Sequence, residues 1–400
     1  MNRGQATWAT SLAVPAALDK EPRRRDTSSM SISNSGPPFR ADHVGSLLRP
    51  PAVLDARARR ARGELAAEEL REVEDAAIAA VIKQQEDVGL QSITDGEFRR
   101  QMFHIDFLKH LQGVAVTGGM PVKFRNQKGE REFSPPRLTV IGRIERTRQL
   151  AVRDFAYVRA HTDRVAKLCI PSPTMLHFRS GRKGISEEVY PDIEDFFADL
   201  ARAYREEVAA LGRAGCTYLQ LDDTNLAYLC DPAMQERTRQ IGEDPDRLPR
   251  LYARIINDSI SSRPPEMTVC IHLCRGNFRS SWVAEGGYEP VAEVLFNELD
   301  VDGYFLEYDD ERSGDFAPLR FVPAGKRVVL GLVSSKVPEL ERREDLKTRI
   351  DEAAQYAPLD QLALSPQCGF SSTVEGNELG ESEEFAKLRL VVDTAADVWG

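Results

Sequence analysis

Short apolar segments alternate with longer amphipathic ones along most of the chain. Eight of the short segments are typical of buried strands, because several are rich in β-branched residues and bounded by Gly, Pro or Asp. They lie at 39–45, 90–94, 166–171, 217–221, 268–273, 303–307, 328–333 and 362–365. Residues 64–88 and 193–214 carry apolar positions at helical spacing, and Gly89 and Gly215 follow them as C-terminal caps.

This alternation predicts an α/β protein with a (β/α)₈ TIM barrel, and an open, doubly wound sheet is the alternative. Residues 113–143 fit neither a barrel strand nor a barrel helix, because glycine and proline pairs interrupt them. We expect them to form an inserted hairpin or long loop after the second strand.

The first 38 residues differ from the rest. They combine a weakly apolar stretch, three consecutive arginines and a run rich in Ser, Gly and Pro. No basic block precedes the apolar stretch, which argues against a secretory signal. We expect a disordered tail at 1–38 and a single barrel catalytic domain at 39–400. Both Met1 and Met30 remain candidate starts of translation.

Charge and cysteine content exclude several classes of protein. A net charge of −10 disfavours binding to nucleic-acid phosphates, and no apolar run is long enough to cross a bilayer. Six scattered cysteines are too few for a secreted disulfide scaffold. We therefore expect a cytoplasmic protein with free or metal-bound thiols and small-molecule partners. Whether it forms a homo-oligomer stays open.

The strongest chemical signal is the sequence CIHLC at residues 270–274. Alternate residues of a strand share a face, so Cys270, His272 and Cys274 point the same way. An ordinary core strand is the alternative for this motif alone. Glu307 ends the next predicted strand and Cys368 follows the last one, and strand ends converge at one mouth of a barrel. We predict Zn²⁺ held by His272, Cys274, Glu307 and Cys368, with Cys270 deeper in the core.

The ligand types indicate the reaction. Two thiolates and a carboxylate more than cancel the charge of zinc, whereas hydrolytic zinc sites usually keep more neutral ligands and an open water position. An electron-rich zinc can instead hold a substrate thiol as thiolate at neutral pH, where a free thiol with a pKa of about 8.5 is mostly protonated. Glu307, the hardest ligand, is expected to leave when the sulfur arrives. The site therefore favours S-alkylation.

These residues resemble the C-terminal catalytic barrel of the cobalamin-independent methionine synthases. In that family an H-x-C motif, a Glu on the next strand and a Cys in a P-x-C-G turn bind zinc, and the four predicted ligands match those positions. Three further motifs follow in the family's order: Val44-Gly45-Ser46, Asp95-Gly96-Glu97 and Gln220-Leu221-Asp222-Asp223. The resemblance implies that Ser46 holds the amino-acid group of homocysteine and that Glu97 and Asp222 bind its amine. Helix capping is the alternative role for these side chains.

The half of the site that would receive the methyl donor departs from the family. The chain has one barrel where long members have two. Val333 stands where the family has a His implicated in proton delivery to the departing folate, and the aromatic residue expected near the folate ring falls at about Phe178. A folate amine leaves poorly unless protonated. His177, Asp223 or His104 could supply that proton, and nothing in the sequence selects among them.

We therefore expect a zinc-dependent thiol S-methyltransferase that moves a methyl group, from methyltetrahydrofolate or another donor, to homocysteine and forms methionine. One alternative is a zinc-dependent alkyltransferase that joins another thiol to an epoxide or other electrophile. A second is a metal-free lyase resembling porphyrinogen decarboxylases. A third is a non-catalytic zinc-binding or thiol-binding protein, although a purely structural site would need no Glu ligand.

Overall fold

The computed structural model describes residues 36–119, 121–126 and 129–400. Its main sheet is parallel, with strands in the order β1-β6-β7-β8-β9-β10-β11, so each strand joins the sheet in chain order. These strands are β1 (Ser92–Ile93), β6 (Val165–Pro171), β7 (Tyr218–Asp223), β8 (Thr268–Leu273), β9 (Gly303–Glu307), β10 (Arg327–Val333) and β11 (Leu362–Pro366). The curled sheet confirms the predicted barrel class.

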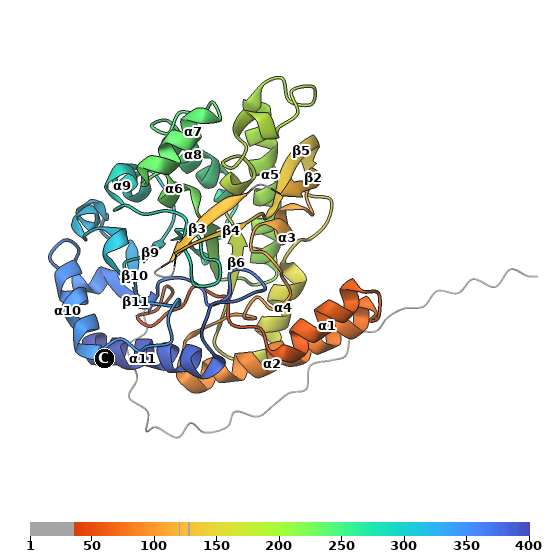
Figure 1. Cartoon of the computed structure of the whole chain (residues 1–400). Helices are drawn as coiled ribbons and strands as arrows, with labels where there is room; N and C mark the ends of the chain where they lie inside the picture. The colour runs from red at the N-terminus through yellow and green to blue at the C-terminus, as the bar shows by residue number, and fades with distance from the viewer. Residues whose placement is uncertain (1–35, 120, 127–128) are drawn as a thin grey trace, which may run out of the picture.

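Helices surround this sheet (Figure 1). They are α1 (Pro51–Ala61), α2 (Ala67–Val88), α3 (Ile105–Leu108), α4 (Val152–His161), α5 (Ile193–Arg213), α6 (Asn225–Tyr228), α7 (Pro232–Gln240), α8 (Leu248–Ile260), α9 (Glu289–Asn297), α10 (Arg343–Ala353) and α11 (Glu381–Trp399). Short 3₁₀ turns lie at Pro173–Leu176, Gly181–Gly184, Glu311–Ser313, Ala317–Phe321 and Leu359–Gln361. The last helix, α11, packs against α10, β11 and α2 and so closes the ring of helices.

Helix α2 shows why the periodic pattern predicted the helices correctly. Its buried positions Ile78, Val81 and Ile82 lie on one face against the core. The helix ends at Gly89, which has a φ of 108°. Glycine reaches this left-handed conformation without strain from a Cβ, as predicted for a C-terminal cap.

The first predicted strand, at 39–45, is much weaker than expected. It contributes one isolated parallel bridge, between Ala41 and Leu364 of β11. The Asp42 side chain accepts hydrogen bonds from the backbone N–H groups of Phe39 (3.1 Å) and His43 (2.8 Å), which diverts the backbone from a regular ladder. On the other side, Thr94 Oγ1 donates to the Gly45 carbonyl at 2.7 Å. Side chains therefore complete the circle between this segment and the region of β1.

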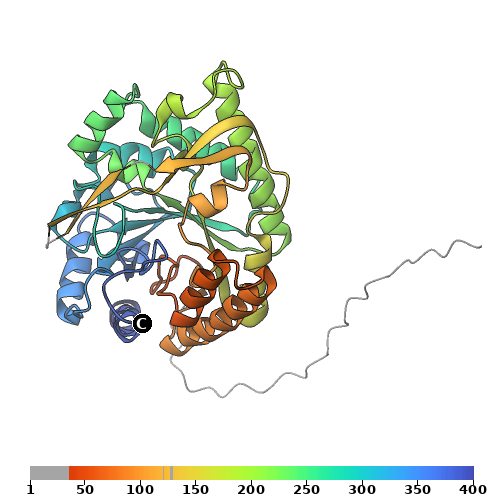
Figure 2. The same cartoon turned by 45° about the vertical axis from the view of Figure 1, so that its right-hand side comes forward.

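The insertion after β1 consists of two antiparallel pairs, as the prediction of an inserted hairpin required. Strands β2 (Gln112–Gly119) and β5 (Pro136–Glu145) form one pair, and β3 (Val122–Asn126) and β4 (Gly129–Phe133) form the other. Arg125 and Trp282 exchange two backbone hydrogen bonds, which fasten β3 to the loop after β8. The β3–β4 arm therefore lies over the mouth of the barrel (Figures 1 and 2).

Two further expectations concern the rest of the chain. The tail predicted at 1–38 falls almost wholly outside the described residues. Within the described part, no helix is long and apolar enough to span a membrane.

Candidate functional site

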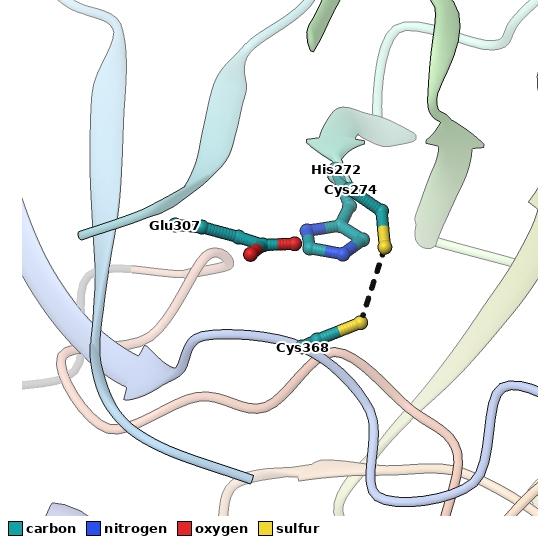
Figure 3. Close-up of side chains that lie close together, drawn as sticks. All are labelled: His272, Cys274, Glu307 and Cys368. Carbon is teal, nitrogen blue, oxygen red and sulfur yellow. Dashed lines mark hydrogen bonds between the residues drawn. The ribbon is translucent and has the colours of Figure 1, made fainter. Parts of the chain in front are cut away.

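The four predicted zinc ligands meet at the carboxyl ends of the strands. His272 lies on β8 and Cys274 directly after it, Glu307 ends β9, and Cys368 follows β11. One ligand atom of each residue lies within 4.8 Å of those of the other three, and all four residues are buried. Figure 3 shows their side chains pointing at a common position. Cys270 lies deeper, in an apolar cluster with Phe305 and Val329, as predicted.

The two sulfur atoms interact directly. Cys274 Sγ and Cys368 Sγ are 3.3 Å apart and share a hydrogen bond (Figure 3). This hydrogen bond lowers the pKa of Cys368 well below the ordinary thiol value and raises that of Cys274. The two thiols therefore influence each other's ionisation, and the thiolate is the form in which cysteine binds metals.

The residues present fit a zinc ion. The set provides an imidazole nitrogen, two sulfurs and a carboxylate oxygen, all of which zinc accepts in tetrahedral sites. Neither ring nitrogen of His272 has a hydrogen-bond partner within the described part of the chain, although the residue is only 2% exposed. A buried polar group without a partner is costly, and a metal bond would satisfy one of these nitrogens. The four residues therefore have the donor atoms and the spacing to hold a metal ion.

Neighbouring groups hold Glu307 in place. Its Oε1 accepts a hydrogen bond from the backbone N–H of Arg275 at 2.8 Å, and its own N–H donates to the Tyr288 hydroxyl at 2.9 Å. Its Oε2 lies 3.5 Å from Arg312 and 3.9 Å from Lys336. The carboxylate is fully buried, so these cations offset the cost of removing its charge from water.

The residues expected to hold homocysteine lie beside the ligands. Ser46 and Asp222 line the same pocket as His272, Cys274 and Cys368. A Cβ on Gly369 would lie 1.9 Å from Ser46 Oγ, so only glycine lets the loop that carries Cys368 approach this serine. Asp222 accepts a hydrogen bond from Gln220 at 2.7 Å, and burial raises its pKa.

Glu97 lies in an adjoining pocket that shares Arg100 with the first. Ligand atoms of Glu97, Cys169 and Asp222 come within 4.8 Å of one another. Arg100 forms an ion pair with Glu97 and lies 3.8 Å from Asp222. The two carboxylates thus already form a binding site for a cation.

The three candidates for proton delivery lie in different surroundings. Asp223 lines the pocket, but its carboxylate accepts hydrogen bonds from the Leu226 backbone (2.9 Å) and the Thr174 hydroxyl (2.7 Å). His177 does not line the pocket. Its Nδ1 contacts the Tyr252 hydroxyl at 2.9 Å, and its Nε2 lies 3.4 Å from Glu243.

The third candidate, His104, lines the pocket and is 2% exposed, and no described residue forms a hydrogen bond with its Nδ1. Burial, with Arg179 and Arg100 nearby, holds the pKa of His104 well below its ordinary value. The ring is therefore neutral at pH 7 before any ligand arrives.

The aromatic residues beside the ligands are not the one expected from the sequence. Phe178 lines a neighbouring pocket that shares Arg179 and Tyr228 with the main one. In the main pocket Phe133 stacks on Phe278, with centroids 4.2 Å apart and planes 12° from parallel, and Phe124 lies 5.2 Å from Phe278. Phe124 and Phe133 come from the inserted arm, so no strand-end motif could have identified them.

Comparison with known proteins agrees with this arrangement. Residues 39–397 match the family described as cobalamin-independent synthase, catalytic domain. An uncharacterized Bacillus subtilis protein, YxjH, is 47% identical over 90% of this chain and 95% of its own length. The crystal structure of a putative vitamin-B12 independent methionine synthase from Listeria monocytogenes is 41% identical, with a TM-score of 0.73, over 92% of this chain and all of that one.

A longer relative shows how the single barrel relates to the larger enzymes. The 5-methyltetrahydropteroyltriglutamate–homocysteine methyltransferase of Bacillus velezensis is 25% identical over 88% of this chain but only 42% of its own length. The match therefore covers less than half of that protein. The family match over nearly all described residues and the ordered motifs give the same result: this chain belongs to the cobalamin-independent synthase family and is a methyltransferase of the cobalamin-independent methionine synthase class.

Proposed function

We propose that this enzyme transfers a methyl group to the sulfur of homocysteine and forms methionine, with Zn²⁺ held by His272, Cys274, Glu307 and Cys368. The observation that carries the proposal is the buried set of four ligand atoms within 4.8 Å of one another. Bound zinc would keep the substrate sulfur as a thiolate at neutral pH.

Residues of this chain would orient the rest of the amino acid. Glu97 and Asp222 would accept hydrogen bonds from the substrate ammonium, where Arg100 now supplies a positive charge. Ser46 Oγ would bind the substrate carboxylate on the opposite side. Glu307 would give up its place to the incoming sulfur.

For the donor we propose methyltetrahydrofolate first. Its ring would lie against Phe278 and Phe133, and its anionic part would face Arg179. Among the three candidate acids, His104 is the best placed, because it lines the pocket and its Nδ1 forms no hydrogen bond with any described residue, whereas Asp223 and His177 already form hydrogen bonds. An anionic donor would raise the low pKa of His104 and so favour its protonated form.

The first test is metal content of the purified protein by elemental analysis, with zinc-edge X-ray absorption before and after homocysteine is added. We expect about one zinc per chain, a gain of one sulfur neighbour with homocysteine, and loss of zinc in Cys274→Ser. Cys270→Ser is the matched control, because Cys270 lies deeper on β8, in an apolar cluster outside the ligand set, and this variant should keep its zinc. Wild-type protein without zinc would reject the mechanism and favour a metal-free lyase.

One observation supports a second candidate. Arg100 and Arg179 line the pocket, and they would suit an anionic thiol other than homocysteine. Such an enzyme would join that thiol to an epoxide or related electrophile. A sulfur gain with a sulfonate-bearing thiol but none with homocysteine would favour this alternative. For either substrate we propose a reducing, cytoplasmic setting, which keeps the six free cysteines reduced.

A further inference from the structure

Lys336 lies next to the carboxylate group of Glu307. The residue is 5% exposed, and its Nζ has no hydrogen-bond partner among the described residues. Its nearest carboxylate oxygen is Oε2 of Glu307, at 3.9 Å. An ammonium group has three N–H donors, so Lys336 keeps unused hydrogen-bonding capacity at this point.

The other nearby cation, Arg312, is less available. It lies 3.5 Å from Glu307 but also binds Asp309 at 2.6 Å and pairs with Asp310. Its guanidinium lies over the Trp282 ring, 4.9 Å from the centroid. Arg312 therefore has a fixed position, and Lys336 is the cation with room for a closer contact.

The turn that carries Lys336 is fastened to the loop that carries Cys368. Ser335 N donates to Gln367 Oε1 at 2.6 Å, and Gln367 N donates to the Val333 carbonyl at 2.8 Å. These bonds hold the lysine close to the ligand set.

Replacing Glu307 by a substrate thiolate exchanges one anionic ligand for another. The thiol proton would leave to solvent, and the substrate sulfur would take the place of the Glu307 oxygen as a ligand. The total charge of the ligands would not change, but the fully buried Glu307 carboxylate would lose its contact with the metal ion. Such a group is strongly destabilised unless another cation takes over.

We propose that Lys336, with Arg312 beside it, receives the Glu307 carboxylate when the substrate thiolate takes its place at the metal. This inference rests on the function proposed above. Lys336 is then a positioning residue, because it acts on thiol binding through Glu307 and touches neither the sulfur nor the donor.

The test compares wild type, Lys336→Met, Lys336→Gln and Lys336→Arg as zinc-loaded proteins. Homocysteine affinity is measured by calorimetry, and the number of sulfur neighbours by zinc-edge X-ray absorption. We expect both neutral variants to keep about one zinc per chain and to bind homocysteine at least tenfold more weakly, and Lys336→Arg to restore most of the affinity. Lys83→Met, which removes an exposed lysine paired with Asp87, is the control and should match wild type.

A double substitution identifies the partner. In a Glu307→Ala background there is no carboxylate to receive, so Lys336→Met should leave homocysteine affinity unchanged. An equal loss with and without Glu307 would overturn the inference. Neutral variants that bind homocysteine as tightly as wild type would also overturn it. So would neutral variants that bind homocysteine more tightly and lose zinc, because that result would mean that Lys336 keeps Glu307 on the metal.

The same data separate this inference from the proposed function. If wild type gains a sulfur neighbour and the neutral variants bind homocysteine equally well, the inference alone is wrong. If zinc-loaded wild type gains no sulfur with homocysteine, the proposed function and this inference are both rejected.

Discussion

The buried ion pair between Lys167 of β6 and Asp42 allows a direct test of how the barrel closes. Both side chains are fully buried, and Nζ lies 3.1 Å from Oδ1. Asp42 also accepts hydrogen bonds from Ser92 Oγ and the Tyr218 hydroxyl, each at 2.8 Å. One carboxylate therefore links the first segment to β1, β6 and β7.

Lys167→Met removes the cation and leaves the carboxylate. At 3.1 Å and an effective dielectric constant of about 20, the pair attracts by about 5 kcal/mol. Removing one partner of a buried pair usually costs about 3 to 5 kcal/mol. We expect the free energy of unfolding in urea, followed by circular dichroism, to fall by about that amount. Asp42→Asn added to Lys167→Met should restore part of it, because no unpaired charge remains.

The pH dependence gives a second readout. Burial raises the pKa of Asp42, but Lys167 and His43 outweigh burial and keep that pKa below its ordinary value. A lowered pKa stabilises the fold above the unfolded-state pKa, and this stability is lost as pH falls through the folded-state pKa. In Lys167→Met burial is no longer opposed by this cation, so the pKa of Asp42 should rise and the acid-induced loss of stability should be smaller than in wild type. A cost below about 1 kcal/mol, or a double variant less stable than the single one, would refute the reasoning.

Three further outcomes are expected. Burial raises the pKa of Glu384 to about 8, from a model-compound value of 4.5. The wild type therefore loses stability as pH rises between these values. The melting temperature of Glu384→Gln should exceed that of wild type at pH 9, and by a smaller amount at pH 6. Equal differences in melting temperature at the two pH values would contradict this. Phe133→Ala removes the ring stacked on Phe278 and should raise the KM for the methyl donor about tenfold without changing homocysteine affinity. The control Ile141→Ala, at an exposed site of the same insertion, should change neither quantity. A similar KM in both variants would exclude Phe133 from donor binding. Asp222→Asn should weaken homocysteine binding in calorimetry at least tenfold while zinc content stays constant, since a charge-assisted hydrogen bond contributes about 1.5 to 3 kcal/mol; unchanged affinity would remove Asp222 from the site.

The zinc ligand set could be proposed from the sequence because each ligand stands at a position that local pattern defines. Alternation on one strand places His272 and Cys274 on one face, and strand order then places Glu307 and Cys368 at the same mouth. These rules need no knowledge of which individual side chains contact one another across the fold. The structure brings together the four residues that these rules selected.

The strand predicted at 39–45 is much weaker in the structure than its apolar pattern suggests. Periodicity at 39–45 cannot reveal that Asp42 hydrogen-bonds its neighbours' backbone groups, and the ladder reduces to the bridge at Ala41. Here a local side-chain contact outweighed a correct apolar pattern.

The donor side could not be predicted in the same way. Phe133 and Phe278 are far apart in sequence, and they meet only because β3–β4 folds across the mouth and pairs with the loop after β8. In the proposed function the thiol side is built on strand ends, whereas Phe124 and Phe133 of the donor wall come from the inserted arm. Changes in the arm should therefore alter which donor is accepted without moving a residue of the predicted zinc ligand set.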